Sequence, residues 1–331
     1  MCFSKLARRE YAAGKHDIPR KESGMNRKRI VDFLVYLVVR ILICIAQSMR
    51  IETDQAIARW LARLFCEVLK IRSGVIEENL LHAFPELSDS ARNRIRREMW
   101  EHLFLLVLEV AHTPRKIHET NWRDHVDLKN ESHLVRLLLG NRPLLIVTGH
   151  LGNFEVGGYL LGILGFPTYT VARTLDNIYI DRFVNQFRGK TGQHIIPKNG
   201  GAEQIEKVLS SNGVMTFLAD QYAGPKGCWV EFFGRPASAY KAIALLALEY
   251  NAVMAVSAAT RMNKPMHFYL HNYAMTDPQA TDGDLGTVRE LTQWYTTRLE
   301  ELIRRTPNQY WWLHRRWKDT REPKQKKRQA A

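Results

Sequence analysis

A histidine and a glutamate that could handle a proton lie five positions apart in PLLIVTGHLGNFEVGG, residues 143–158. His150 and Glu155 are the two groups in this stretch that can move or hold protons near neutral pH. On one helix they would point about 140° apart, at roughly 100° per residue, and on one strand they would face opposite sides. They can therefore meet only if the chain turns between them, which Gly149 and Gly152 permit.

The residues around this pair predict a strand, a tight turn and a helix. The apolar run Leu144–Val147 is typical of a short buried strand, and His150 comes shortly after it. Asn153 is a suitable helix N-cap, which would put Glu155 in the first helical turn, where the helix dipole favours its ionised form. We therefore expect an imidazole at a strand end with a carboxylate beside it.

From residue 124 onward, short apolar runs alternate with amphipathic segments. The predicted strands are 125–128, 144–147, 168–172, 194–196, 214–219, 230–233, 252–258 and 267–271, and the predicted helices are 132–139, 153–164, 177–190, 202–209, 238–250 and 285–305. This alternation predicts an α/β domain, residues 51–320, with a mixed, largely parallel central sheet flanked by helices on both faces. In its N-terminal part we expect two further helices, at 54–71 and from 88–89 onward.

Three of the predicted strand ends carry polar groups, and ligands of such sheets gather beyond the carboxyl ends of the strands. His150 follows one strand, Arg173 a second, and Asp220 with Gln221 a third. A base, a carboxylate that orients it, a guanidinium and a second carboxylate could form an acyl-transfer site without a covalent intermediate. Each residue alone also has a structural alternative, because a histidine, arginine or aspartate at a strand end often only anchors a loop.

The sequence lacks the motifs of several other enzyme classes. The sequence has no GxSxG, HExxH or GxxxxGK[ST] motif and no GxGxxG after a strand. Its four cysteines, at positions 2, 44, 66 and 228, show no CxxC spacing, and no histidine stands at metal-ligand spacing. We therefore expect reduced structural thiols and neither a metal nor another cofactor.

The formal net charge of +14 is concentrated at the two ends of the 331-residue chain. Residues 1–30 carry nine Lys and Arg against three acidic residues, and residues 315–331 carry eight against two. We expect a basic extension at 1–26 and a basic tail at 321–331. This distribution argues against a nucleic-acid face across the fold and suits anionic lipid or an acidic protein partner.

The apolar stretch 30–49 is long enough to cross a bilayer, but it contains charged residues. A central arginine costs about 2.5–3.5 kcal/mol on insertion scales. Asp32, Tyr36, Arg40 and Gln47 form one narrow polar stripe on a helix. We expect a membrane-anchor or interfacial helix within 27–50 that turns this stripe towards protein or head groups. A buried soluble helix and a cleaved signal peptide are the alternatives; the internal Arg40 and the lack of a clear A-x-A site count against the peptide.

Two further clusters have open interpretations. Arg92, Arg94, Arg96 and Arg97 could touch lipid phosphate, although a solvated helix face is the commoner explanation for such a run. The aromatic and basic segment 310–317 is typical of a membrane interface or of a cap on a sheet edge.

HLGNFE, residues 150–155, resembles the HX4D/E motif of lipid acyltransferases. The wider set resembles the late, lauroyl/myristoyl acyltransferases of bacterial lipid A biosynthesis: ENLLHAFPELS (78–88), VARTLDN (171–177), the 188–192 segment, LADQ (218–221), VEFFGRPA (230–237) and PNQYWWLHRRWK (307–318). The matches run in order from about residue 25 to 320. The FPEGTR-type element of glycerophosphate acyltransferases is missing. NIYID stands where the family more often has a proline after Asn177, which leaves the acceptor head group open.

The resemblance implies a glycerolipid-acyltransferase-like fold and a role for each matching residue. His150 would be the general base and Glu155 would orient its imidazole. Arg173 would hold an acceptor phosphate or stabilise the oxyanion, and Asp220 would be either catalytic or structural. Further candidates for substrate binding are Asn153, Asn177 and Gln221.

The implied reaction is O-acyl transfer from an acyl thioester to a hydroxyl of a lipid A precursor or related glycolipid. The donor would be acyl-acyl carrier protein, an acidic partner, or acyl-CoA. The setting would be the bacterial inner membrane, with the catalytic domain on its cytoplasmic side. An acyl-thioester hydrolase and a non-catalytic lipid-binding scaffold on the same fold are the alternatives.

Overall fold

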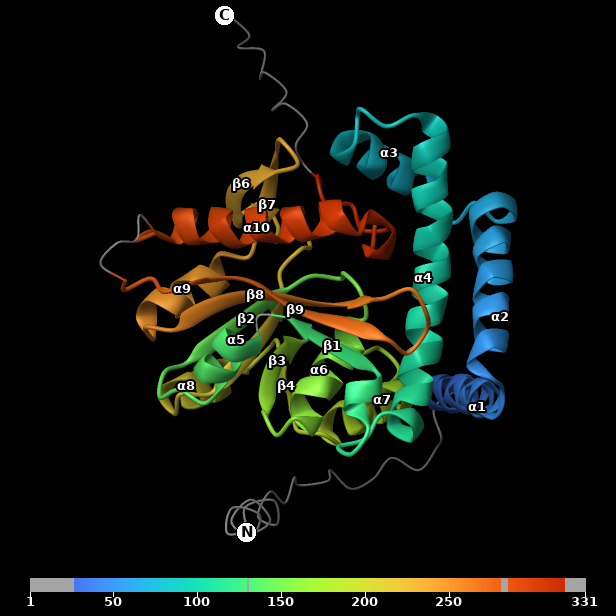
Figure 1. Ribbon diagram of the computed structural model, residues 1–331, viewed down its shortest axis with the longest axis horizontal. Helices are drawn as coiled ribbons and strands as arrows, with labels where there is room; N and C mark the ends of the chain where they lie inside the picture. Colours follow the sequence, from blue (N-terminus) through green and yellow to red (C-terminus); the bar gives the residue numbers. More distant parts are fainter. Residues whose placement is uncertain (1–26, 130, 281–284, 319–331) are drawn as a thin grey trace, which may run out of the picture.

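The computed structural model describes residues 27–129, 131–280 and 285–318. Its centre is a seven-stranded sheet with the order β1-β9-β8-β2-β5-β3-β4 (Figure 1). The strands are β1 (Val126–Lys129), β2 (Leu144–Thr148), β3 (Thr168–Ala172), β4 (Gln193–Pro197), β5 (Val214–Leu218), β8 (Val253–Arg261) and β9 (Phe268–Thr276). Neighbouring strands are parallel except for the antiparallel pair β8–β9. The predicted mixed, largely parallel sheet is confirmed.

Helices cover both faces of this sheet, as predicted. Because side chains alternate along a strand, β2 buries Leu145 and Val147 on one face and Leu144 and Ile146 on the other. The first face packs with α8 (Ala202–Ser210), α9 (Lys241–Glu249) and α10 (Val288–Arg305), and the second with α5 (Glu131–Leu138) and α6 (Phe154–Ile163). Helix α7 (Ile178–Gly189) packs beside β4 and α6.

One strand is missing from the prediction, and the predicted helix 238–250 begins inside it. Ser238 belongs to a strand, not to the start of a helix: β6 (Cys228–Phe232) and β7 (Arg235–Ala239) form a separate antiparallel hairpin, and α9 begins at Lys241. The two residues between the strands, Phe233 and Gly234, have φ of 52° and 69°. Positive φ at both positions is the requirement of a type I′ hairpin turn, whose usual sequence signal is Asn-Gly or Gly-Gly. Phe-Gly does not carry that signal.

In the part of the chain that the structure describes, four α-helices precede the sheet: α1 (Arg27–Ser48), α2 (Ile51–Arg63), α3 (Ser73–Ala83) and α4 (Asp89–Lys116). A π-helical segment, Leu64–Val68, continues α2, and Ser88 caps α4, so both predicted helices are confirmed. Helix α4 stands upright beside the sheet with α2 along it and α1 at its foot (Figure 1).

The polar stripe of α1 turns towards protein, as predicted. The Arg40 guanidinium lies 4.7 Å from the ring centroid of Phe183 in α7, and Gln47 donates to the Ala111 carbonyl of α4 at 2.6 Å. Among the described residues, α1 is the helix long and apolar enough to cross a membrane. Its outer side exposes Ile30, Val31, Phe33, Leu34, Val35, Leu37, Val38, Ile41, Leu42 and Ile45. The predicted extension 1–26 and tail 321–331 lie outside the described residues.

Candidate active site

His150 and Asp220 meet at the carboxyl end of the sheet because their strands are neighbours in register. Thr148 of β2 pairs with Leu218 of β5, so the positions two residues beyond each strand lie side by side. Imidazole Nδ1 is 2.9 Å from Asp220 Oδ1, and the backbone N–H of His150 donates to Oδ2 at 3.0 Å. An ionised carboxylate can only accept, so Nδ1 carries the proton and Nε2 is left as the basic nitrogen.

Burial and charge act in opposite directions on this pair. Burial lowers the pKa of His150, but the charge of Asp220, the hydrogen bond to it and the charge of Glu155 together hold that pKa above its ordinary value. Burial likewise raises the pKa of Asp220, yet the imidazole's charge and hydrogen bonds outweigh it and leave the pKa of this carboxyl below its ordinary value. The pair therefore stabilises an imidazolium next to a carboxylate.

The C-terminal segment completes the surroundings of the pair. The rings of Trp311 and Phe154 contact the imidazole edge-on, with centroids 5.1 Å and 5.0 Å away. The Tyr310 side chain hydrogen-bonds Asp220, and burial with the charge of that carboxylate raises the pKa of Tyr310. Tyr310 and Trp312 are buried. Segment 310–317, for which the sequence left a membrane interface and a cap on a sheet edge open, thus buries much of its aromatic surface inside the protein.

His150 lines a cavity of about 600 Å³ at the carboxyl edge of the sheet. β3 and β5 are paired only at Tyr169–Met215 and Thr170–Thr216, although both strands continue beyond that point. The cavity lies where they separate. Most of its wall is apolar: Ile146, Phe154, Leu161, Val171, Ala172, Ile205, Phe217, Leu218, Ile243, Leu246 and Leu270. Polar and charged lining residues include His150, Glu155, Arg173, Arg188, Lys198 and Gln221.

Glu155 lies at the start of α6, and its hydrogen-bond partner is Arg188 rather than His150. Arg188 of α7 donates through Nε to Glu155 Oε2 at 2.9 Å and through Nη2 to Oε1 at 2.5 Å. Glu155 still faces the cavity and still acts on the imidazole through its charge. Within the described residues, Asp220 is the carboxylate that hydrogen-bonds the imidazole.

Arg173 and Lys198 form neighbouring cations at the rim of the cavity. Ala172 of β3 pairs with Pro197 of β4, and each cation directly follows its strand. The Arg173 side chain is 78% exposed and forms an ion pair with Asp176 at 2.8 Å. Sequence reasoning missed Lys198, although its position after β4 matches that of Arg173 after β3.

Asn153 and Asn177 do not line the cavity; both are helix caps. Asn153 Oδ1 accepts from the Val156 N–H, which confirms the predicted cap of α6. Asn177 Oδ1 accepts from the N–H groups of Tyr179 and Ile180 in the first turn of α7, and its Nδ2 donates to the Asp32 carbonyl of α1 at 2.8 Å. Gln221, the third candidate for substrate binding, does line the cavity.

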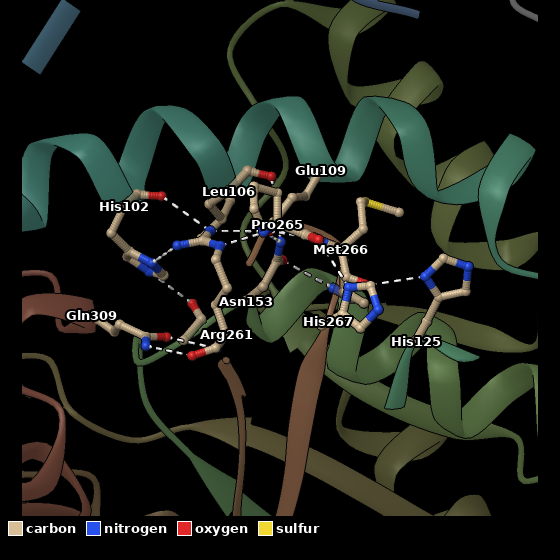
Figure 2. Close-up of polar contacts among 12 residues, drawn as sticks. His102, Leu106, Glu109, His125, Asn153, Arg261, Pro265, Met266, His267 and Gln309 are labelled. Carbon is tan, nitrogen blue, oxygen red and sulfur yellow. Dashed lines mark hydrogen bonds and ion pairs between the residues drawn. The ribbon is translucent and has the colours of Figure 1, made fainter. Parts of the chain in front are cut away.

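A buried polar network behind the turn anchors it to α4 (Figure 2). Glu109 Oε1 and Oε2 accept from Arg261 at 2.6 Å and 2.7 Å, and Oε2 also accepts from Asn153 Nδ2 at 2.9 Å. His102 bridges Arg261 and the Gly152 carbonyl. Sequence reasoning missed this network. The sequence did hold a signal for it. Glu109 is the one charged residue in the apolar helical run LFLLVLEV, residues 103–110, and a buried charge needs a partner.

The fold is α/β, and a histidine hydrogen-bonded to an aspartate lines a largely apolar cavity at the carboxyl end of its sheet. The family model of bacterial lipid A biosynthesis acyltransferases matches residues 19–319. The lipid A biosynthesis palmitoleoyltransferase of Escherichia coli (strain K12) is 23% identical over 256 residues, covering 76% of this chain and 80% of that protein. The lauroyltransferase of the same organism is 23% identical over 263 residues, covering 78% and 83%. The phosphatidylinositol mannoside acyltransferase of Mycolicibacterium smegmatis is 24% identical over 200 residues, covering 59% and 63%.

The chain therefore belongs to the bacterial lipid A biosynthesis acyltransferase family. It is an acyltransferase that acts on lipid acceptors.

Proposed function

We propose that this enzyme moves a fatty acyl chain from an acyl thioester to a hydroxyl of a lipid A precursor or related glycolipid, with His150 as general base. The observation that carries the proposal is the 2.9 Å contact between His150 Nδ1 and Asp220, which leaves Nε2 as the basic nitrogen of a residue that lines the cavity. A positioned base of this kind typically contributes about 10²–10⁴-fold to rate.

The reaction proceeds without a covalent enzyme intermediate. Nε2 removes the proton of the acceptor hydroxyl as its oxygen forms a bond to the thioester carbonyl carbon. The tetrahedral intermediate collapses, the carbon–sulfur bond breaks, and the imidazolium returns its proton to the departing thiolate. The products are an ester on the acceptor and a free thiol, and His150 is again neutral.

Asp220 orients the imidazole and stabilises its charged form, a role that the sequence had suggested for Glu155. Glu155 acts from a distance through its charge and holds Arg188 at the cavity wall. Arg173, with Lys198 beside it, binds anionic groups of the acceptor at the rim. A guanidinium at this position favours phosphate, because its planar fork of N–H donors matches the spacing of two phosphate oxygens.

The apolar lining of the cavity suits an acyl chain, since burying each CH₂ is worth about 0.8 kcal/mol. The relatives' names concern lipid A and phosphatidylinositol mannoside, so a sugar-bearing lipid is the proposed acceptor. Acyl-acyl carrier protein or acyl-CoA is the proposed donor.

We place the enzyme at the bacterial inner membrane with its catalytic domain on the cytoplasmic side. The membrane contact is supported by α1: its polar stripe contacts α7 and α4, and its outer side exposes ten large apolar residues, Ile30 to Ile45. A helix so arranged lies against the domain and buries its apolar side in the lipid interface.

Membranes holding wild-type or His150→Ala protein, incubated with labelled acyl-acyl carrier protein or acyl-CoA and candidate glycolipids, test this function. We expect labelled acceptor only with the wild type. Transfer that survives the alanine substitution would exclude His150 as the base. Labelled free fatty acid without acylated acceptor would indicate a thioester hydrolase, and neither product would indicate a lipid-binding scaffold.

A further inference from the structure

His102 of α4 contacts the turn that carries the proposed base from behind. Its side chain is buried, with Nε2 3.2 Å from the Gly152 carbonyl and Nδ1 2.7 Å from Arg261 Nη1 (Figure 2). A guanidinium only donates hydrogen bonds, so Nδ1 must accept and Nε2 must carry the proton. The tautomer of His102 is thereby fixed as the one that donates to Gly152.

This imidazole stays neutral, in contrast to His150. Burial and the charge of Arg261 hold the pKa of His102 well below its ordinary value, against a small opposite effect of the bond to Gly152. A protonated His102 would place a second cation against the guanidinium, which is unfavourable in a buried site. His102 therefore donates the same hydrogen bond throughout the working pH range.

Arg261 is itself held by its surroundings. Glu109 accepts from its Nε at 2.6 Å and from its Nη2 at 2.7 Å. Gln309 fixes its backbone: Oε1 accepts from the Arg261 N–H at 2.7 Å, and Nε2 donates to the Arg261 carbonyl at 2.8 Å. The partner of His102 is thus fixed in place by α4 and the C-terminal segment.

The turn has little freedom once these bonds are made. The Gly152 N–H donates to the Gln309 carbonyl at 2.9 Å, and the Asn153 N–H donates to the Ala259 carbonyl at 2.7 Å. We propose that His102 is a positioning residue of the acyl-transfer reaction: it fixes the Gly152 carbonyl, and through the turn it sets His150 against Asp220. The proposal rests on the proposed function of His150 as general base.

The pKa of His150 depends on the charged and titratable groups that face it. They are Asp220 beyond β5, Glu155 at the start of α6 with its partner Arg188, and His314 of the C-terminal segment. None of them is altered by substituting His102. If the turn relaxes, the His150–Asp220 hydrogen bond weakens, and the pKa of His150 falls, because burial is then less opposed by the charge and hydrogen bond of Asp220.

Three variants of the full chain separate positioning from stability. His102→Leu removes the donor to Gly152. His102→Gln restores it, because an amide offers both a donor for Gly152 and an acceptor for Arg261. The matched control is His112→Leu: His112 is likewise buried on α4 and pairs with Asp54 of α2 at 2.5 Å. It makes this contact on the α2 side of the helix, so its loss destabilises the helix packing and leaves the turn intact.

Two readouts are measured below the unfolding temperature of each variant. One is kcat and KM with lauroyl-CoA and a lipid A precursor; the other is the pKa of His150 from its imidazole resonances in a proton NMR titration. We expect His102→Leu to lower kcat by about 10²-fold, the cost of a 1 Å misplacement of a reacting group, with KM little changed and the pKa of His150 lowered. His102→Gln should regain most of the wild-type kcat and of the wild-type pKa of His150, and His112→Leu should keep the wild-type value of each.

A His102→Leu protein with the wild-type kcat and His150 titration would overturn the proposal, as would a His112→Leu protein that loses as much. If His102→Leu does not fold, His102→Asn takes its place, because its shorter amide stays polar but withdraws the donor from Gly152. The NMR titration does not depend on turnover. A wild-type enzyme without transfer activity would therefore count against the proposed function, whereas an unshifted titration would count against His102.

Discussion

His150 and Asp220, seventy positions apart in the chain, form a hydrogen bond of 2.9 Å between imidazole Nδ1 and carboxylate Oδ1. The register between β2 and β5 brings them together, because Thr148 and Leu218 are paired two residues earlier in each strand. The carboxylate closer in sequence, Glu155, pairs with Arg188. Each carboxylate thus has its own basic partner, His150 for Asp220 and Arg188 for Glu155, and the predictions below follow from that division.

The rate of acyl transfer should fall at low pH because the base must be neutral. Asp220 and Glu155 raise the pKa of His150 above 6.5 in spite of its burial. We therefore expect kcat/KM to fall as His150 becomes protonated at low pH, with the midpoint of that fall above 6.5. A pH–rate profile of the wild type checks this, and an acid limb centred well below 6.5 would contradict it.

The same pair links stability to pH with opposite signs for its two members. The pKa of Asp220 is depressed, so its stabilisation is present above its unfolded value and is lost as pH falls through the folded pKa. The pKa of His150 is raised, so its contribution is present below 6.5 and is lost as pH rises through the folded pKa. Urea unfolding of wild type and His150→Ala at several pH values should show their difference in stability shrinking above that pKa.

Gly152 should be intolerant of any side chain. Its φ is +62°, and an added Cβ would lie 2.0 Å from the Ala259 carbonyl oxygen. Gly165 offers a matched control, because its φ is +88° but an added Cβ there would meet no atom within 4 Å. We expect Gly165→Ala to cost about 1–2 kcal/mol from the left-handed backbone alone, and Gly152→Ala to cost more and to abolish transfer. Equal losses in denaturant unfolding would contradict the close approach.

Arg173 should serve binding of the acceptor more than chemistry. It is exposed at the cavity rim, where Lys198 stands beside it. Arg173→Ala should therefore raise KM for a phosphorylated acceptor several-fold and leave kcat nearly unchanged, since an interaction made equally in ground and transition states affects KM. A fall in kcat with constant KM would instead assign Arg173 to the oxyanion.

Charges on the outer side of α1 should weaken membrane association without unfolding the domain. Leu34 and Leu42 are 52% and 59% exposed. We expect the double variant Leu34→Lys, Leu42→Lys to float less with vesicles of neutral lipid. Arg40→Met is the contrasting variant, because it changes the side that faces α7. Unchanged flotation of the lysine variant would argue against α1 as the membrane contact.

The sequence allowed most elements of the domain to be predicted, because the apolar runs and amphipathic segments are local signals. It also placed His150, Arg173 and Asp220 at strand ends. It could not show which carboxylate reaches the imidazole. That choice depends on β5 lying between β2 and β3, and strand order is a property of the whole sheet. Proximity in sequence therefore favoured Glu155.

The buried polar network behind the turn could not be predicted from the sequence for a similar reason. Arg261 stands 159 positions from His102 and 152 from Glu109 in the sequence, and only the fold brings the end of β8 against α4. The family motif at residues 171–177 predicts a substrate-binding role for Asn177. Its side chain caps α7 and holds α1, a use that required the position of α1 to be known.

The most direct measurement compares Asp220→Asn with Glu155→Gln in kcat/KM across pH, using the same donor and acceptor. With Asp220 as the partner of His150, Asp220→Asn should lower kcat by about 10²–10⁴-fold and move the acid limb to lower pH. Glu155→Gln should cost less and move the limb less, because it removes only a distant charge from the imidazole. The reverse order, with Glu155→Gln the more damaging and the more strongly shifted, would contradict the His150–Asp220 pair as the catalytic base.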